Sequence, residues 1–164
     1  SGVLNDQPVF AARKPPASSV RAGATFGGPI AVDRTFIFGS YEGRRARSAN
    51  IVASPVAPQA EVRNDEDEHL ALVKLDHRQG SNDLVSLRYN GQWFTWVNEN
   101  GGLWLPGSGQ KYRNDVHTVL ASHTHLVSSG ILHTARMQFA RYTDLRTDLA
   151  PSLYVFRAGH SVEG

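Results

Sequence analysis

The fifteen residues from Asp83 to Val97 alternate between apolar and polar side chains, over a length that strands of soluble proteins rarely reach. At about 3.4 Å per residue, such a strand is about 50 Å long. Tilted by about 40°, it would cross a ~25 Å apolar band and project beyond it. The alternation therefore suits a strand with lipid on one face and water on the other. The apolar face carries Val85, Leu87, Tyr89, Trp93 and Val97, and the polar face carries Ser86, Arg88, Asn90 and Gln92, before Phe94 and Trp96.

The rest of the chain predicts a regular alternation of short and long connections between strands. Six strands are expected, at about 20–30, 35 to beyond 47, 69–77, 83–97, 115–127 and 131–145. The connections 31–34, 79–82 and 128–130 are short, whereas 48–68 and 98–114 are long polar segments. Short turns at one end and long loops at the other are typical of outer-membrane barrels. We predict an all-β fold, an antiparallel up-and-down meander of about six long strands that is part of a transmembrane β-barrel.

The organisation of the chain follows from the same pattern. We expect an irregular lead-in or partial strand over residues 1–19, a barrel segment of three hairpins over 20–147, and a loop or the start of the next strand over 148–164. A helix over 63–75 is a weaker alternative, because the turn cluster "QGSN" that follows predicts a hairpin. No apolar run of about 18 residues is present, which excludes a transmembrane helix from the interpretation.

Composition narrows the function further. Seventeen Lys and Arg against fifteen Asp and Glu leave a net charge of +2, which does not favour nucleic-acid binding. The chain has no cysteine, so disulfides, zinc–thiolate sites and cysteine nucleophiles are excluded. The "GSG" of 107–109 lacks the frame of a nucleophile elbow. We therefore expect neither an enzyme nor a cofactor.

The stretch "FGGPIAVDRTFIFGSYEGRR" resembles a segment of TonB-dependent outer-membrane receptors, the Oar-like group with a carboxypeptidase-regulatory-like N-terminal domain. A second match is "LVKLDHRQGSNDLVSLRYN", which resembles the next hairpin of those receptors. A third and weaker one is "LVSSGILHTARMQFARYT", where Leu132 and His133 replace a usual Asn-Glu pair. The resemblance covers about Val20 to Thr143. The residues of the first match are Gly27, Gly28, Pro29, Ile30, Asp33, Phe36, Phe38, Tyr41, Glu42 and Gly43.

The resemblance implies an early-barrel segment of a receptor that is several times longer, with a plug domain and a barrel of about 22 strands. It implies energy-coupled solute uptake across the outer membrane of a Gram-negative bacterium. The implied partners are outer-membrane lipid, an unknown solute, and the TonB complex acting through a plug domain that this chain lacks. Two alternatives stay open. One is a self-contained eight-stranded barrel for adhesion or envelope integrity, with extra strands at "QPVFAAR" and "SLYVFRAG". The other is a soluble β-sandwich binding module.

Two groups of side chains are candidates for membrane contact. Aromatic residues near the second long loop favour an interfacial girdle, with sugar stacking as an alternative role. The arginines that follow the second strand suit lipopolysaccharide phosphates, or equally a solvated strand end. The girdle candidates are Tyr41, Tyr89, Trp93 and Trp96, and the lipopolysaccharide candidates are Arg44, Arg45 and Arg47.

Two further clusters are interpreted without a ligand. The histidines at 117, 123, 125 and 133 have a spacing that can hold a metal, but no carboxylate or cysteine in the pattern completes the shell. We expect these imidazoles to line water or a strand end instead. The acidic run is expected to be a solvated loop rather than a calcium site. It consists of Glu61, Asp65, Glu66, Asp67 and Glu68.

Overall fold

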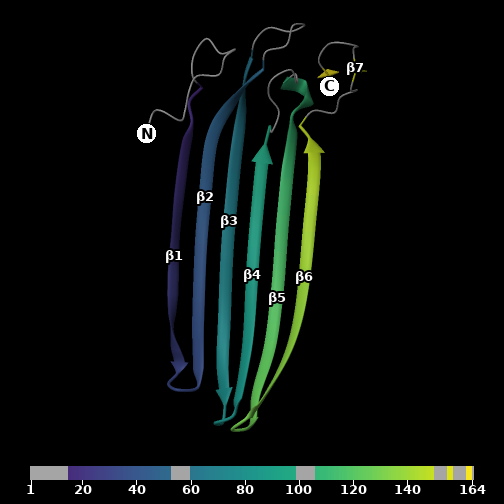
Figure 1. Cartoon of the computed structure of the whole chain (residues 1–164). Coiled ribbons are helices and arrows are strands. Elements are labelled where there is room, and N and C mark those ends of the chain that lie inside the picture. The colour runs from purple at the N-terminus through teal and green to yellow at the C-terminus, as the bar shows by residue number, and fades with distance from the viewer. Residues whose placement is uncertain (1–14, 53–59, 99–105, 150–154, 157–161, 164) are drawn as a thin grey trace.

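The computed structural model describes residues 15–52, 60–98, 106–149, 155–156 and 162–163. Six long strands lie side by side in one sheet, each antiparallel to its neighbours and in chain order (Figure 1). They are β1 (Ser18–Ala31), β2 (Thr35–Val52), β3 (Ala60–Gln79), β4 (Asp83–Val97), β5 (Gln110–Ser128) and β6 (Ile131–Asp148). A 3₁₀ turn, η1 (Pro106–Ser108), precedes β5, and the short strands β7 (Val155–Phe156) and β8 (Val162–Glu163) pair separately. The predicted six-stranded meander is confirmed.

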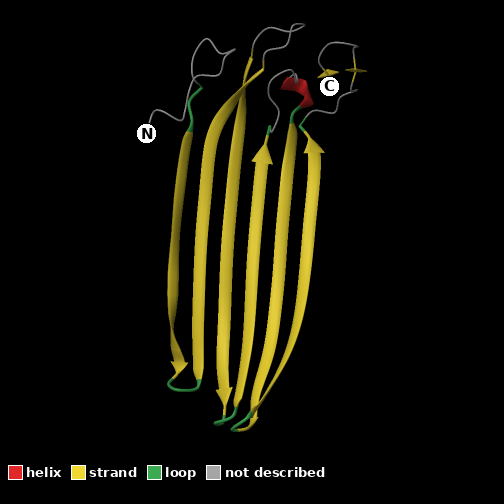
Figure 2. Ribbon diagram, in the orientation of Figure 1, coloured by secondary structure: helices red, strands yellow, loops and turns green. Residues whose placement is uncertain are grey.

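All three short turns lie at the same end of the sheet (Figure 2). In the first turn the backbone N–H of Arg34 donates to the carbonyl of Ala31 at 3.1 Å, and Asp33 has a positive φ of 59°. In the second turn Gly80 has a φ of 72°. Asp and Gly tolerate this left-handed conformation, so two hairpins are closed by residues suited to them. We refer below to this end as the turn side and to the opposite end as the loop side.

Two strands begin earlier than the sequence predicts. β2 continues beyond residue 47 as expected and ends at Val52, but 60–68, expected to be part of a polar loop, belong to β3. β5 begins at Gln110 rather than near 115, and the helical alternative over 63–75 is wrong. The charged side chains of this region are typical of a loop when the sequence is considered locally. In the structure they face each other across β2 and β3, where opposite charges stabilise strand pairing. Residues 53–59 lie outside the described part of the chain.

The six-stranded sheet is a single layer without a conventional core. Val52 is the one described apolar residue that is buried, whereas many large apolar side chains are exposed, among them Phe139 at 66% and Met137 at 74%. A β-sandwich needs a second sheet packed on the first, so the described residues do not support that alternative. β1 and β6 are the two edges, and the sheet is not closed within these residues. Among them, no helix has the length and apolar character needed to cross a membrane.

Candidate functional site: two faces of one sheet

Strand pairing divides the side chains between an apolar face and a polar face. Residues opposite each other in the register share a face, so Val73 of β3, Tyr89 of β4 and Val119 of β5 lie together. The apolar face carries Phe26, Ile37, Val73, Leu75, Leu87, Val119, Met137 and Phe139. The polar face carries Thr25, Ser40, Lys74, Asn90, Gln92, Thr118 and Gln138. This division extends the alternation predicted for β4 to the neighbouring strands, and the polar face also includes apolar side chains such as Phe38, Leu72 and Leu120.

The sheet is hollowed on its polar face. The hollow has a volume of about 770 Å³ and is lined mainly by small or uncharged polar-face side chains from β1 to β5, including Thr25, Ser40, Leu72, Asn90, Gln92 and Thr118. A barrel wall encloses its lumen on the concave side. The hollow therefore lies where a barrel with polar side chains inside would have its lumen.

Two tyrosine–histidine pairs lie on the loop side of the apolar face. The Tyr41 hydroxyl is hydrogen-bonded to Nδ1 of His69 at 2.6 Å, and the Tyr89 hydroxyl to Nδ1 of His117 at 2.8 Å. The paired rings are stacked, with centroids 6.0 and 6.1 Å apart. Trp93 adds an edge-on contact to His117 at 5.5 Å. We call these five residues the loop-side row.

Each tyrosine of this row lies near a glycine two residues further along its strand. A β-carbon at Gly43 would lie 3.3 Å from the Tyr41 hydroxyl, and one at Gly91 would lie 2.7 Å from that of Tyr89. The glycine thus leaves the space that the tyrosine needs to reach the histidine on the next strand.

A second row of histidine contacts lies on the turn side of the same face. The Thr35 hydroxyl is bonded to Nδ1 of His77 at 2.9 Å. One carboxylate oxygen of Asp83 accepts from Nδ1 of His125 at 2.7 Å and from Nε2 of His123 at 2.8 Å. We call these five residues the turn-side row.

The two rows repeat along the sequence with one spacing. Four positions recur after 48 residues: Thr35 and Asp83, Tyr41 and Tyr89, His69 and His117, His77 and His125. Within β3 and within β5 the two bonded histidines are eight residues apart, or about 27 Å along the strand. The apolar faces of two successive strand pairs, β2–β3 and β4–β5, are thus built on the same plan, with a histidine at each end of the apolar run.

The register of these histidines gives the slant of the rows. His69 pairs with Trp93, whereas His117 pairs with Gly91, so the row shifts by two residues over two strands. The row is therefore displaced by about 6.8 Å along the strands over a distance of about 9.6 Å across them. This is a slant of about 35° from the direction perpendicular to the strands. Strands of membrane barrels tilt by about 35–45°. With this slant the two rows are about 22 Å apart, close to the ~25 Å apolar band of such barrels.

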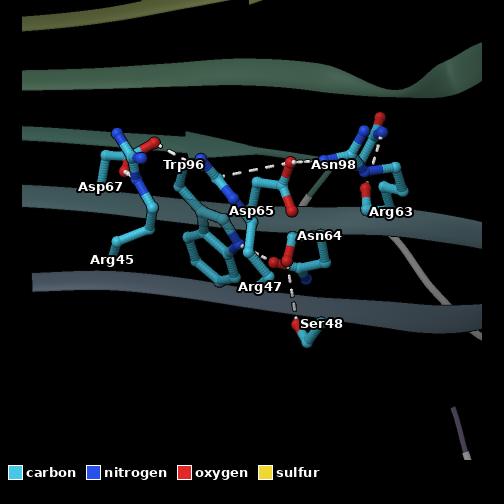
Figure 3. Close-up of polar contacts among 9 residues, drawn as sticks. All are labelled: Arg45, Arg47, Ser48, Arg63, Asn64, Asp65, Asp67, Trp96 and Asn98. Carbon is cyan, nitrogen blue, oxygen red and sulfur yellow. Dashed lines mark hydrogen bonds and ion pairs between the residues drawn. The ribbon is translucent and has the colours of Figure 1, made fainter. Parts of the chain in front are cut away.

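The four predicted girdle residues do not share one face. Tyr41, Tyr89 and Trp93 belong to the loop-side row on the apolar face. Trp96 lies on the polar face, where its indole N–H donates to Oδ1 of Asn64 at 2.5 Å (Figure 3). Trp96 thus faces the opposite side of the sheet from the other three, because side chains alternate along β4 and only its odd-numbered positions lie on the apolar face. Trp104, another aromatic residue of this region, lies outside the described residues.

The three predicted arginines pair with the acidic run. Nη1 of Arg44 lies 2.9 Å from Glu66 on the polar face. On the apolar face, beyond the loop-side row, Nε of Arg45 lies 2.8 Å from Asp67, and Nη1 of Arg47 lies 3.2 Å from the same carboxylate (Figure 3). The hydrogen bond from Arg45 is the largest cause that lowers the pKa of Asp67. The acidic run is therefore in a strand and not a solvated loop, and Asp65, Glu66 and Asp67 are ion-paired because the β2–β3 register brings them close to the arginines.

The histidines considered as metal ligands have other partners. His117 is bonded to Tyr89, and His133 lies directly opposite His125 in the register. A carboxylate does accompany His123 and His125, which the sequence did not indicate, but both imidazoles bond the same oxygen of Asp83. Within the described ranges, no three His, Cys, Asp or Glu residues are arranged to hold a metal ion.

The Asp83 contact predicts a measurable titration at the turn side. Hydrogen bonds from His125 and then His123 hold the pKa of Asp83 below its ordinary value. Because the pKa is lowered in the folded protein, the stabilisation from this contact is fully present above about pH 3.9, the ordinary pKa of an aspartate. It is lost as the pH falls through the lower pKa that Asp83 has in the folded protein. We expect a ¹³C-carboxyl NMR titration to give a midpoint below the ordinary one. Replacing His125 and His123 by alanine should raise it, and an unchanged midpoint would contradict the contact.

Comparison with known families agrees with this geometry. A family model described as an outer membrane beta barrel domain matches residues 2–66, a range that includes β1, β2 and the first residues of β3. Searches of curated proteins and of solved structures found no match. The family match and the six-stranded meander together support an outer-membrane β-barrel protein, with the outer membrane as its location.

Proposed function

We propose that the chain forms part of the barrel wall of a TonB-dependent transporter, which takes up a solute across the outer membrane of a Gram-negative bacterium. The resemblance that supports this proposal lies in the hairpin of β1 and β2. "FGGPI" lies at the turn-side end of β1, and "TFIFGSYEG" begins β2 directly after the turn. The same proposal includes an unknown solute as the transported molecule and the TonB complex as a partner that acts through a plug domain. It assigns no catalytic role to the chain.

The observation that carries the barrel part of this proposal is the pair of histidine rows on the apolar face. Between them the face is almost wholly apolar, while the opposite side is polar and hollowed. Every backbone group in lipid needs a hydrogen-bond partner, and an antiparallel wall supplies it between neighbouring strands. Lipid on the apolar face and water on the polar face account for both surfaces at once.

On this proposal each row has a place in the membrane. The loop-side row, with Tyr41, Tyr89 and Trp93, lies at the outer interface, where aromatic rings are favoured. Arg45 and Arg47 lie just beyond it and remain our candidates for contact with lipopolysaccharide phosphates, in competition with their partners in β3. The turn-side row lies at the periplasmic interface.

Uptake measurements test the transporter proposal. In cells that express the full-length protein, we expect solute-dependent growth or uptake to fall to background when the TonB complex is deleted, because the transport step needs its energy. A porin-type protein expressed in the same two strains serves as the control, and its permeability should not change. Uptake that persists without TonB would contradict the proposal.

A self-contained outer-membrane barrel is the second candidate. The family match is to an outer-membrane barrel domain in general, which suits this candidate equally well. β1 runs toward the turn side and β6 away from it, so the two edges are antiparallel, as closure with an even number of strands requires. Such a protein would act in adhesion or envelope integrity. The same measurement separates the two, because its function would not depend on TonB.

A further inference from the structure

We propose that the turn-side end of the polar face binds a small oxyanion, that is, a phosphate or carboxylate group of a solute. The proposal goes beyond the uptake role. It applies whether the strands belong to a transporter or to a smaller barrel, because it concerns one end of the polar face alone.

Charge is unevenly distributed along the polar face. The loop-side half is rich in carboxylates and also holds three arginines. The turn-side part holds four cationic strand residues from β3, β4 and β6, but its described strands offer Asp76 alone as an acid. The loop-side residues are Glu42, Glu66, Glu68, Asp144, Asp148, Arg21, Arg44 and Arg146, and the turn-side cations are Lys74, Arg78, Arg88 and Arg136. The turn side therefore has a local excess of positive charge.

A hollow of about 240 Å³ lies within this basic region. It is lined by Arg34, Phe36, Lys74, Asp76, Arg78 and Leu84, together with Ser86. The backbone N–H of Arg78 donates to the carbonyl of Arg34 at 2.7 Å, which fastens the first turn beside β3. Two guanidinium groups from separate elements are thus held at one hollow whose walls also contain an aromatic ring and a leucine.

The one acid in the hollow is already engaged. Lys74 lies 2.7 Å from one oxygen of Asp76, and the Ser86 hydroxyl donates to the other at 2.5 Å. The described residues provide no side-chain hydrogen bond or ion pair for Arg34 or Arg78, the two arginines that line the hollow. These guanidinium groups are exposed, so an incoming anion meets them without having to displace a carboxylate.

The strand register adds a second reason to expect an anion. Lys74 lies directly opposite Arg88 across β3 and β4. Like charges in such positions destabilise a sheet, and Asp76 offsets only the charge of Lys74, so Arg88 adds positive charge beside the hollow. Arginine side chains present paired N–H groups that match the oxygens of phosphate and carboxylate. The chemistry of the hollow therefore selects an oxyanion rather than a cation or a neutral sugar.

Calorimetric titration of the full-length protein in detergent with inorganic phosphate, and separately with succinate, tests the proposal. We expect the wild type to bind at least one of the two probes. The Arg34→Gln/Arg78→Gln variant should bind about tenfold or more weakly, because two charge-assisted hydrogen-bond donors are lost. Arg21→Gln/Lys111→Gln removes the same charge elsewhere on the sheet and should bind as the wild type does. Phosphate alone, succinate alone or both will identify the group that the hollow accepts.

The proposal is overturned if neither probe binds the wild type, or if the two double variants are weakened equally. NMR of ¹⁵N-labelled arginine in the wild type keeps the test independent of how the variants fold. A shift of the Arg34 and Arg78 side-chain signals on adding the bound probe supports the site, and unchanged signals contradict it. Neither result depends on TonB, so failure here is distinguishable from failure of the uptake proposal.

Discussion

Replacing Val119 with arginine is expected to destabilise the protein by about 1–3 kcal/mol, because a cationic side chain on the lipid face costs most at the bilayer midplane and less toward an interface, and Val119 lies between the two. Val119 lies on the apolar face between His117 and His125 and is 38% exposed. The arginine would have to leave water for hydrocarbon or bend toward an interface. Unfolding by urea of the full-length protein in lipid vesicles measures the free-energy difference from the wild type.

The adjacent residue provides a matched control. Thr118 is similar in shape to Val119 and lines the large hollow on the polar face. Thr118→Arg introduces the same side chain into water, so its free energy of unfolding should stay within about 0.5 kcal/mol of the wild type. If the two variants lose equal stability, or if the order is reversed, the assignment of lipid to the apolar face is wrong.

Replacing Gly23 with valine is the second change with a large expected effect, about 1–3 kcal/mol of destabilisation. Gly23 in β1 lies opposite Glu42 in β2. A β-carbon built there would be 2.7 Å from the backbone oxygen of Tyr41, which cannot swing aside as a side chain would. The pairing of β1 with β2 must therefore distort, and urea unfolding in vesicles again measures the cost.

Gly28 of the same strand is the control for this substitution. A β-carbon at Gly28 would meet no atom within 4 Å, and the position lies on the apolar face opposite Ile37. Gly28→Val should therefore leave the stability unchanged or raise it, since valine is favoured in strands. Equal losses for the two valine variants would show that the effect comes from the loss of any glycine in β1 and not from the close approach at Gly23.

The bounds of a strand can be predicted from the sequence where its own residues show the alternation. β4 has the predicted bounds, Asp83–Val97, because its side chains alternate from Val85 to Trp93 and a Gly-containing turn precedes it. For β3 the sequence predicts a start at His69, but the strand begins at Ala60. Its first residues are charged and resemble a loop. Their partners are in β2, so the stabilising contact is long-range and absent from any local window of sequence.

The same limit applies to the candidate site. The local alternation marks Tyr41, Tyr89 and Trp93 as aromatic residues of membrane strands, but it does not indicate that His69 and His77 belong to the same rows. The 48-residue repeat of tyrosine and histidine positions is present in the sequence and would have revealed them. The hydrogen bonds, the slant of the rows and the basic hollow at Arg34 and Arg78 depend on which residues oppose each other.

By itself the sequence determined the fold class, the number of long strands and the end of the sheet at which the short turns lie. Alternation and turn residues are local properties, and they suffice for these features. The tertiary structure decided which charges pair, where the apolar face ends and where the polar face is hollowed. These depend on register and curvature, which arise when strands distant in sequence are brought within hydrogen-bonding distance.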